Sequence, residues 1–248
     1  MIDPHAENYL PVSPYAYVAN NPIIFIDPDG RDIYRYDDKT GEFILYKETD
    51  DNYDQVGRFR RDRETGEYTL RTNRKGEART RISHVEKGIL SDGINFKEND
   101  NLFEVGGEGQ PSEQGVKSFA LNLSELVGKE ISGLAYSSGS SGEITDMVIG
   151  KYKDNTRTMS ISTRGTELVR KYGVDNYSQN NVLQVFHTHP DGELGAIVSA
   201  NPSISTDYRN LQNQKPFLPN ARFLILRRIP GQRKPDEYDY THHYKPRN

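Results

Sequence analysis

Apolar residues recur at helical spacing in one part of the chain and alternate with polar residues in several others. Six of them predict a helix over about 114–129 with one apolar face: Val116, Phe119, Ala120, Leu123, Leu126 and Val127. Shorter patterns predict strands over 131–136, 146–152, 157–162, 182–187, 221–229 and 238–243, and helices over 166–172 and 205–212. Helices mixed with a largely antiparallel sheet predict an α+β domain over residues 111–248.

Two further regions precede this domain. Residues 1–32 are interrupted repeatedly by proline and by Asn-Asn-Pro, and only a short strand over 22–26 followed by a turn is expected there. Residues 33–110 are highly charged: the segment 31–100 holds 15 basic and 16 acidic side chains, which leaves few apolar residues to bury. We therefore expect this second region to be a partly ordered connector.

One pattern occurs twice in the connector, 25 residues apart. The first copy reads Asp-Asp-Lys-Thr-Gly-Glu from Asp37, and the second reads Asp-Arg-Glu-Thr-Gly-Glu from Asp62. In each copy a glycine turn stands before alternating apolar and polar residues, which predicts a β-hairpin. Because charges of both signs are interspersed, we interpret the charged side chains as a solvated hairpin face.

Composition excludes several kinds of chemistry. The 248 residues include no cysteine, so disulfides, cysteine-ligated zinc and thiol catalysis are excluded. The net charge is −4, which argues against a nucleic-acid partner, since phosphate binding needs clustered positive charge. No apolar run approaches the roughly 18 residues of a membrane helix, so no membrane span is expected. The first 20 residues lack the pattern of a classical signal peptide.

The most informative segment is Val-Leu-Gln-Val-Phe-His-Thr-His-Pro, residues 182–190. Alternate side chains of a strand share a face, so His187 and His189 point to the same side at the end of the predicted strand. Two imidazoles placed in this way can hold one Zn²⁺ ion. Catalytic zinc usually takes a third protein ligand, and Asp207, at the start of a predicted helix, is the candidate carboxylate.

A metal-activated water also needs a base that accepts its proton. Glu130 comes directly before the strand predicted over 131–136, and a carboxylate there could project towards the metal. Glu143 is the rival candidate, although the Ser/Gly-rich loop around it would hold it less firmly.

These elements together resemble the JAB/MPN metallopeptidase family and its JAMM motif. The matching residues are Glu130 with Gly133, the His187-Thr188-His189-Pro190 segment, and Asp207. The resemblance implies a cytidine-deaminase-like mixed sheet flanked by helices, zinc held by the two histidines and the aspartate, and the glutamate as general acid and base. In the family a serine three residues before the aspartate stabilises the oxyanion. That position is Ile204 here, and Ser203 and Ser205 on either side are both candidates.

The N-terminal region resembles a different family. Its Asp-Pro near residue 3, Ser-Pro-Tyr near residue 14, Asn-Asn-Pro at 20–22 and Asp-Pro-Asp-Gly at 27–30 resemble the closing motif of the RHS repeat-associated core. The resemblance implies that a variable C-terminal domain follows, as in polymorphic toxins. Arg31 stands where self-cleaving versions usually carry an apolar residue, so we expect no self-cleavage at this point.

Together these inferences predict a zinc-dependent hydrolase of peptide or isopeptide bonds that serves as the toxin cargo of an RHS-type protein. It would be made in the cytoplasm and exported as a secreted effector without a classical signal peptide. The expected partners are a protein or peptide substrate in a target cell and an immunity protein. Two alternatives are a catalytically degenerate JAB-like interaction module and, less favoured by the acidic balance, a His-metal nuclease toxin. His242 and His243 are interpreted as surface residues, and no role follows for His84.

Overall fold

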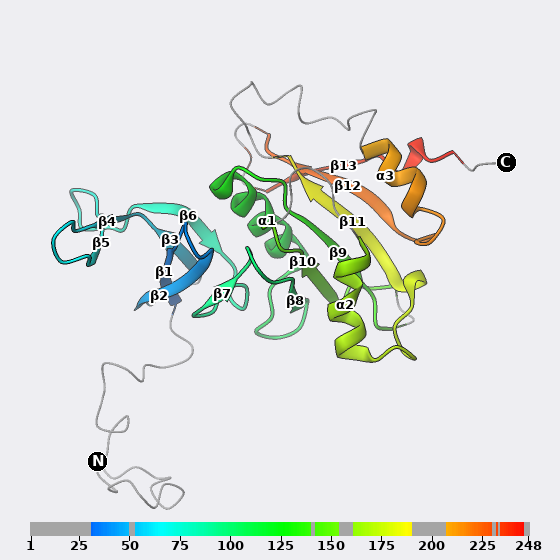
Figure 1. Cartoon of the computed structure of the whole chain (residues 1–248), viewed down its shortest axis with the longest axis horizontal. Coiled ribbons are helices and arrows are strands. Elements are labelled where there is room, and N and C mark those ends of the chain that lie inside the picture. The colour runs from blue at the N-terminus through cyan, green and yellow to red at the C-terminus, as the bar shows by residue number, and fades with distance from the viewer. Residues whose placement is uncertain are drawn as a thin grey trace, which may run out of the picture.

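The computed structural model describes residues 31–49, 53–139, 142–153, 161–189, 207–229, 232 and 234–245. The N-terminal region with its expected strand over 22–26 lies outside these residues. What is described is an α+β structure built on two main sheets (Figure 1). No helix within the described ranges is both long and apolar enough to cross a membrane.

The first sheet has five strands in the order β6-β3-β1-β2-β7 and lies within the predicted connector (Figure 1). Its strands are β1 (Arg31–Tyr36), β2 (Glu42–Thr49), β3 (Asp54–Gly57), β6 (Thr80–Val85) and β7 (Ile94–Asn95). A separate hairpin is formed by β4 (Phe59–Arg61) and β5 (Tyr68–Leu70). The connector is therefore more regular than its high charge predicts.

The repeated pattern forms two turns of the same design, so the predicted hairpins are confirmed. Asp37 joins β1 to β2 and Asp62 joins β4 to β5, and in each turn the Asp Oδ1 atom accepts hydrogen bonds from the backbone two and three residues later. Gly41 and Gly66 close these turns at φ 83° and 77°, values that residues with a Cβ rarely adopt. The side-chain cap and the glycine explain why six residues suffice to specify each hairpin.

The second sheet has six strands in the order β13-β12-β11-β9-β10-β8. They are β8 (Asn101–Glu104), β9 (Ser132–Tyr136), β10 (Asp146–Ile149), β11 (Val182–Thr188), β12 (Arg222–Arg227) and β13 (Asp236–Asp239). Only β11 and β12 pair in parallel. Strand β8 comes from the region predicted as connector, so this region contributes strands to both sheets.

Helices cover both faces of the second sheet. On one face α1 (Glu113–Val127) packs against Ala135 and Phe186, among other residues. On the other face α2 (Ile161–Tyr172) and α3 (Asp207–Gln214) contribute Leu168 and Leu211 to a second core. The helix predicted over 114–129 is thus confirmed, with a Ser112 N-cap and Gly128 at its C-terminus.

The first sheet and the second share one hydrophobic core. Phe43 of β2 lies in ring contact with Phe96 and with Phe119 of α1, at centroid distances of 5.8 and 6.0 Å. The same cluster continues to Phe186 in the second sheet. A small number of large aromatic side chains therefore compensates for the scarcity of apolar residues in the charged region.

Two predicted strands are wrong at their C-terminal ends. Residues 161 and 162, expected at the end of a strand over 157–162, are the first two residues of α2, and Leu168 of this helix is buried in the second core. Residues 157–160 lie outside the described part. The strand expected over 238–243 is shorter, because β13 ends at Asp239 and Thr241–His243 form a 3-10 helix. Tyr240 between them has φ −108° and ψ 12°, which stops the strand.

We expect Phe43→Ala to lower the free energy of unfolding by about 3–5 kcal/mol, because it empties a fully buried position of the shared core. Hydrogen exchange followed by mass spectrometry should show lower protection in both sheets. Phe217→Ala is the matched control, since Phe217 is 66% exposed, and its effect should stay within about 0.5 kcal/mol. Loss of protection confined to the first sheet would contradict a shared core.

Candidate metal centre

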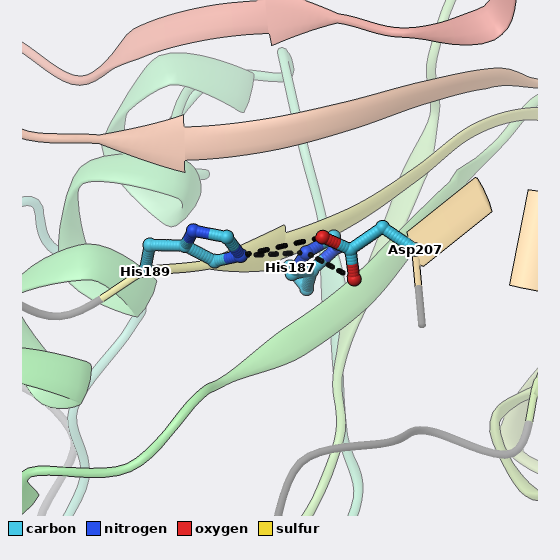
Figure 2. Close-up of side chains that lie close together, drawn as sticks. All are labelled: His187, His189 and Asp207. Atoms are coloured by element: carbon cyan, nitrogen blue, oxygen red, sulfur yellow. Dashed lines mark hydrogen bonds and ion pairs between the residues drawn. The ribbon is translucent and has the colours of Figure 1, made fainter. Parts of the chain in front are cut away.

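The candidate centre lies where β11 ends and α3 begins (Figure 2). His187 is paired with Ser132 of β9 on one side and with Ile225 of β12 on the other, so it sits in the middle of the sheet. His189 follows one pleat later, and its backbone N–H donates to the Leu226 carbonyl at 3.1 Å. Both rings therefore project from backbone that is held on both sides.

Asp207 reaches this point from a distant part of the chain. It is the first residue of α3, and Leu211, one turn later, is fully buried in the second core. This packing holds the start of the helix against the sheet and aims the carboxylate at the two histidines (Figure 2). The side chains of His187, His189 and Asp207 are only 10–13% exposed.

The three side chains converge on one point. The two Nε2 atoms are 3.1 Å apart, and the Asp207 oxygens lie 3.6 Å from His187 Nε2 and 3.8 Å from His189 Nε2 (Figure 2). Ligands about 2.0–2.1 Å from a tetrahedral zinc ion are roughly 3.3 Å from one another. The observed separations bracket that value, so the three side chains are spaced as metal ligands are. Among the described residues, His187, His189 and Asp207 form the group of three side chains that could hold a metal ion.

Electrostatics also suit a cation at this point. Burial and, to a smaller extent, the neighbouring His187 lower the pKa of His189 from 6.5 to about 4, although Asp207 acts in the opposite direction. His189 is therefore neutral at pH 7, which is the form that binds a metal. The buried carboxylate beside it contributes negative charge, and buried charges are stable only when they are paired or coordinate a metal.

Glu130 lies at the same end of the sheet. Ile131 N–H donates to Thr188 Oγ1 and Thr188 N–H donates to the Ile131 carbonyl, both at 2.8 Å, so Glu130 comes directly before this contact in the chain. Burial raises the pKa of Tyr240, and the charges of Asp207, Asp239 and Glu130 raise it further. Glu130 and Asp207 are thus both within electrostatic range of one phenol.

Glu143, the rival base, is placed at the opposite end of β9. The loop that carries it returns to the sheet through Thr145, whose N–H donates to the Tyr136 carbonyl. Tyr136 is four residues from Ser132, which corresponds to roughly 13 Å along a strand. Of the two candidate bases, Glu130 is therefore at the end of β9 that lies beside the histidines, and Glu143 is at the other end.

Two buried hydroxyls fix the backbone around Glu130. Thr188 Oγ1 donates to Ser124 Oγ at 2.6 Å, and Ser124 Oγ donates to the Lys129 carbonyl, also at 2.6 Å. Together with the bond from Ile131 N–H, these contacts hold the residue before Glu130 and the residue after it. We call Ser124 and Thr188 the hydroxyl clamp. It ties the end of α1 to β11 and fixes the start of the Glu130 side chain.

Sequence reasoning missed the residues that surround the ligands. Tyr240 is 3% exposed and places its ring edge-to-face with His187 at a centroid distance of 6.1 Å. Ser132 is fully buried opposite His187, and within the described residues its Oγ has no hydrogen-bond partner. A serine inside an apolar strand and a threonine between two histidines were the available signals, since both place a hydroxyl where burial is expected.

Other expected site residues lie elsewhere. Ser203 and Ser205 are outside the described residues. His84 stacks on Tyr53 in the connector at a centroid distance of 3.7 Å. His242 is exposed, and His243 packs against Tyr208 at 4.7 Å, so neither joins the ligand group.

Comparisons with protein-family models, with curated proteins and with solved structures found no match.

Thr188→Val should lower the free energy of unfolding by about 1–3 kcal/mol, because it leaves the buried Ile131 N–H without its acceptor. Urea unfolding measures the change, and Thr188→Ser, which keeps a hydroxyl, should recover most of the loss. Thr69→Val, at an exposed strand position, serves as the control and should have little effect. An equal loss in the serine variant would show that the methyl group, rather than the clamp, matters.

Proposed function

We propose that this protein is a zinc-dependent hydrolase that cleaves peptide or isopeptide bonds. The observation that carries the proposal is the convergence of His187, His189 and Asp207 at metal-ligand spacing, with Glu130 on the adjoining strand end. Two imidazole nitrogens and one carboxylate are a donor set that zinc accepts, and three protein ligands leave a coordination position for water or substrate. Structural zinc sites in contrast usually fill all four positions with protein ligands.

The chemistry divides between the metal and the chain. Zinc held by the three side chains would supply Lewis acidity, which acidifies water and polarises a scissile carbonyl. Glu130 accepts the proton of the attacking water and delivers it to the leaving nitrogen. The hydroxyl clamp holds the Glu130 backbone, so this proton transfer starts from a fixed geometry. Asp207 and the two histidines remain ligands throughout.

The proposed biological setting depends on the N-terminal motif between residues 3 and 30. Its resemblance to the RHS core supports a hydrolase that is toxin cargo, acting on a protein in a target cell and restrained by an immunity protein in the producer. An amide hydrolase also fits the negative net charge better than a nuclease does.

Protein purified without added metal should contain about one equivalent of zinc, and His189→Ala should lose it. Inductively coupled plasma mass spectrometry gives the metal content directly. His242→Ala is the matched control, because His242 is exposed and outside the ligand group, and it should retain the parent's zinc. Folded parent protein that neither contains nor takes up zinc would reject the metal centre and favour the interaction-module alternative.

Glu130→Gln should retain zinc but lower the hydrolysis rate by about 10²–10⁴, because an amide cannot accept the proton. Activity can be followed with a fluorogenic peptide mixture and with peptides joined through a lysine side chain. Glu143→Gln is the matched control: it makes the same substitution at the far end of β9 and should leave the rate within twofold of that of the parent. Undiminished hydrolysis by Glu130→Gln would remove Glu130 from the mechanism. If the parent protein cleaved DNA or RNA and no peptide, the result would point to a nuclease.

A further inference from the structure

A groove with a surplus of positive charge lies between α1 and the first sheet, and its lining includes none of the three candidate metal ligands. It consists of two adjoining cavities of about 610 and 710 Å³, which share Arg81 of β6 and Asn122 of α1. Figure 1 shows β6 beside α1, so the groove follows the junction of the two sheets. Its lining contains six cationic side chains: Arg35, Arg58, Arg71, Arg81, Arg228 and Lys234.

The three carboxylates of the lining are already engaged. Asp38 pairs with Arg81 at 3.0 Å, Glu125 pairs with Arg228 at 2.9 Å, and Glu86 accepts hydrogen bonds from the backbone and side chain of Ser112. They therefore do not neutralise Arg58 and Arg71. Arg58 donates to the Thr80 carbonyl, which satisfies a hydrogen bond but leaves the charge uncompensated.

Strand pairing concentrates this charge. The Arg71 N–H donates to the Arg58 carbonyl at 2.8 Å, and the Arg58 N–H donates to the Arg79 carbonyl at 2.7 Å. All three arginines are exposed, and they lie on neighbouring segments of backbone. Arg58 and Arg71 both line the groove, so their charges lie on one exposed surface that an anionic ligand can contact.

Three aromatic rings of the groove already have stacking partners, which disfavours nucleic acid. The Arg35 guanidinium lies 4.0 Å from the centre of the Tyr68 ring, Arg81 lies 5.5 Å from that of Tyr36, and Tyr53 stacks on His84. Unpaired bases bind proteins largely by stacking on exposed aromatic faces. The remaining lining offers amide and hydroxyl groups, such as those of Gln114, Ser118 and Asn122, which can hydrogen-bond a polypeptide backbone.

We propose that this groove binds an acidic polypeptide segment of a protein partner. One wall ends at Arg228, two residues beyond Leu226, whose carbonyl holds His189. A segment in the groove therefore passes close to the strand ends that carry the metal ligands. On the basis of the proposed function, the partner is the substrate, and the hydrolase selects proteins with acidic segments near the cleaved bond. The charged connector is then a recognition surface in addition to a solvated hairpin face.

The test is a fluorescence-polarisation titration of the full chain with labelled decaglutamate at low salt and at 0.15 M salt. The parent should bind saturably, and Arg58→Gln with Arg71→Gln should weaken binding about tenfold, since two exposed charge contacts are lost. Arg63→Gln with Arg74→Gln removes the same charge from exposed turns outside the lining and should change the affinity less than twofold.

Several results would overturn the proposal. These are the absence of saturable binding, an equal loss in both double variants, and tighter binding of a ten-nucleotide single-stranded DNA than of decaglutamate. His189→Ala should bind decaglutamate as the parent does, because the ligand group is not part of the groove. Saturable binding that depends on Arg58 and Arg71 in a protein that holds no zinc would support the groove while rejecting the hydrolase.

Discussion

The antiparallel contact between the start of β9 and the end of β11 is the interaction on which the candidate site depends. Reciprocal bonds between Ile131 and Thr188 set the register, and the hydroxyl clamp adds the end of α1 to the same point. This register places Glu130 on the segment beside His189 and Ser132 opposite His187. A shift of one residue would turn these side chains to the other face of the sheet. The hydrogen bonds of the buried hydroxyls therefore fix the register of β9 against β11, which apolar packing alone would specify less strictly.

Stability and chemistry are supplied by different parts of the second sheet. Both of its faces are covered by helices, and its central strands are almost wholly buried, which gives the ligands a rigid base. The ligands themselves stand at the strand ends, where backbone pairing stops and side chains from a following helix can approach. Burial there keeps His189 neutral, which is the form that binds a metal, and the Asp207 carboxylate lies beside it.

The sheet of the charged connector contains few apolar residues and is stabilised because these residues pack into a core that it shares with α1 and the second sheet. Phe43 and Phe96 are fully buried because Phe119 of α1 supplies the surface that they cover. The polar residues left outside then gather along the junction with α1, where strand pairing sets arginines side by side. Packing of the two sheets thus creates both the shared core and a groove with its own charge.

Local patterns by themselves determined the α1 helix, both Asp-x-x-Thr-Gly hairpins and the two histidines on one face, because each depends on residues within a few positions of one another. The helix predicted over 166–172 lies within α2, whose first two residues were predicted as the end of a strand; Leu168 of this helix is buried in the second core. Tertiary structure alone decided the contact of Tyr240 with His187, the hydroxyl clamp and the union of the two sheets. These contacts join residues tens of positions apart, and their free energy exists only once strand register and helix packing have brought them together.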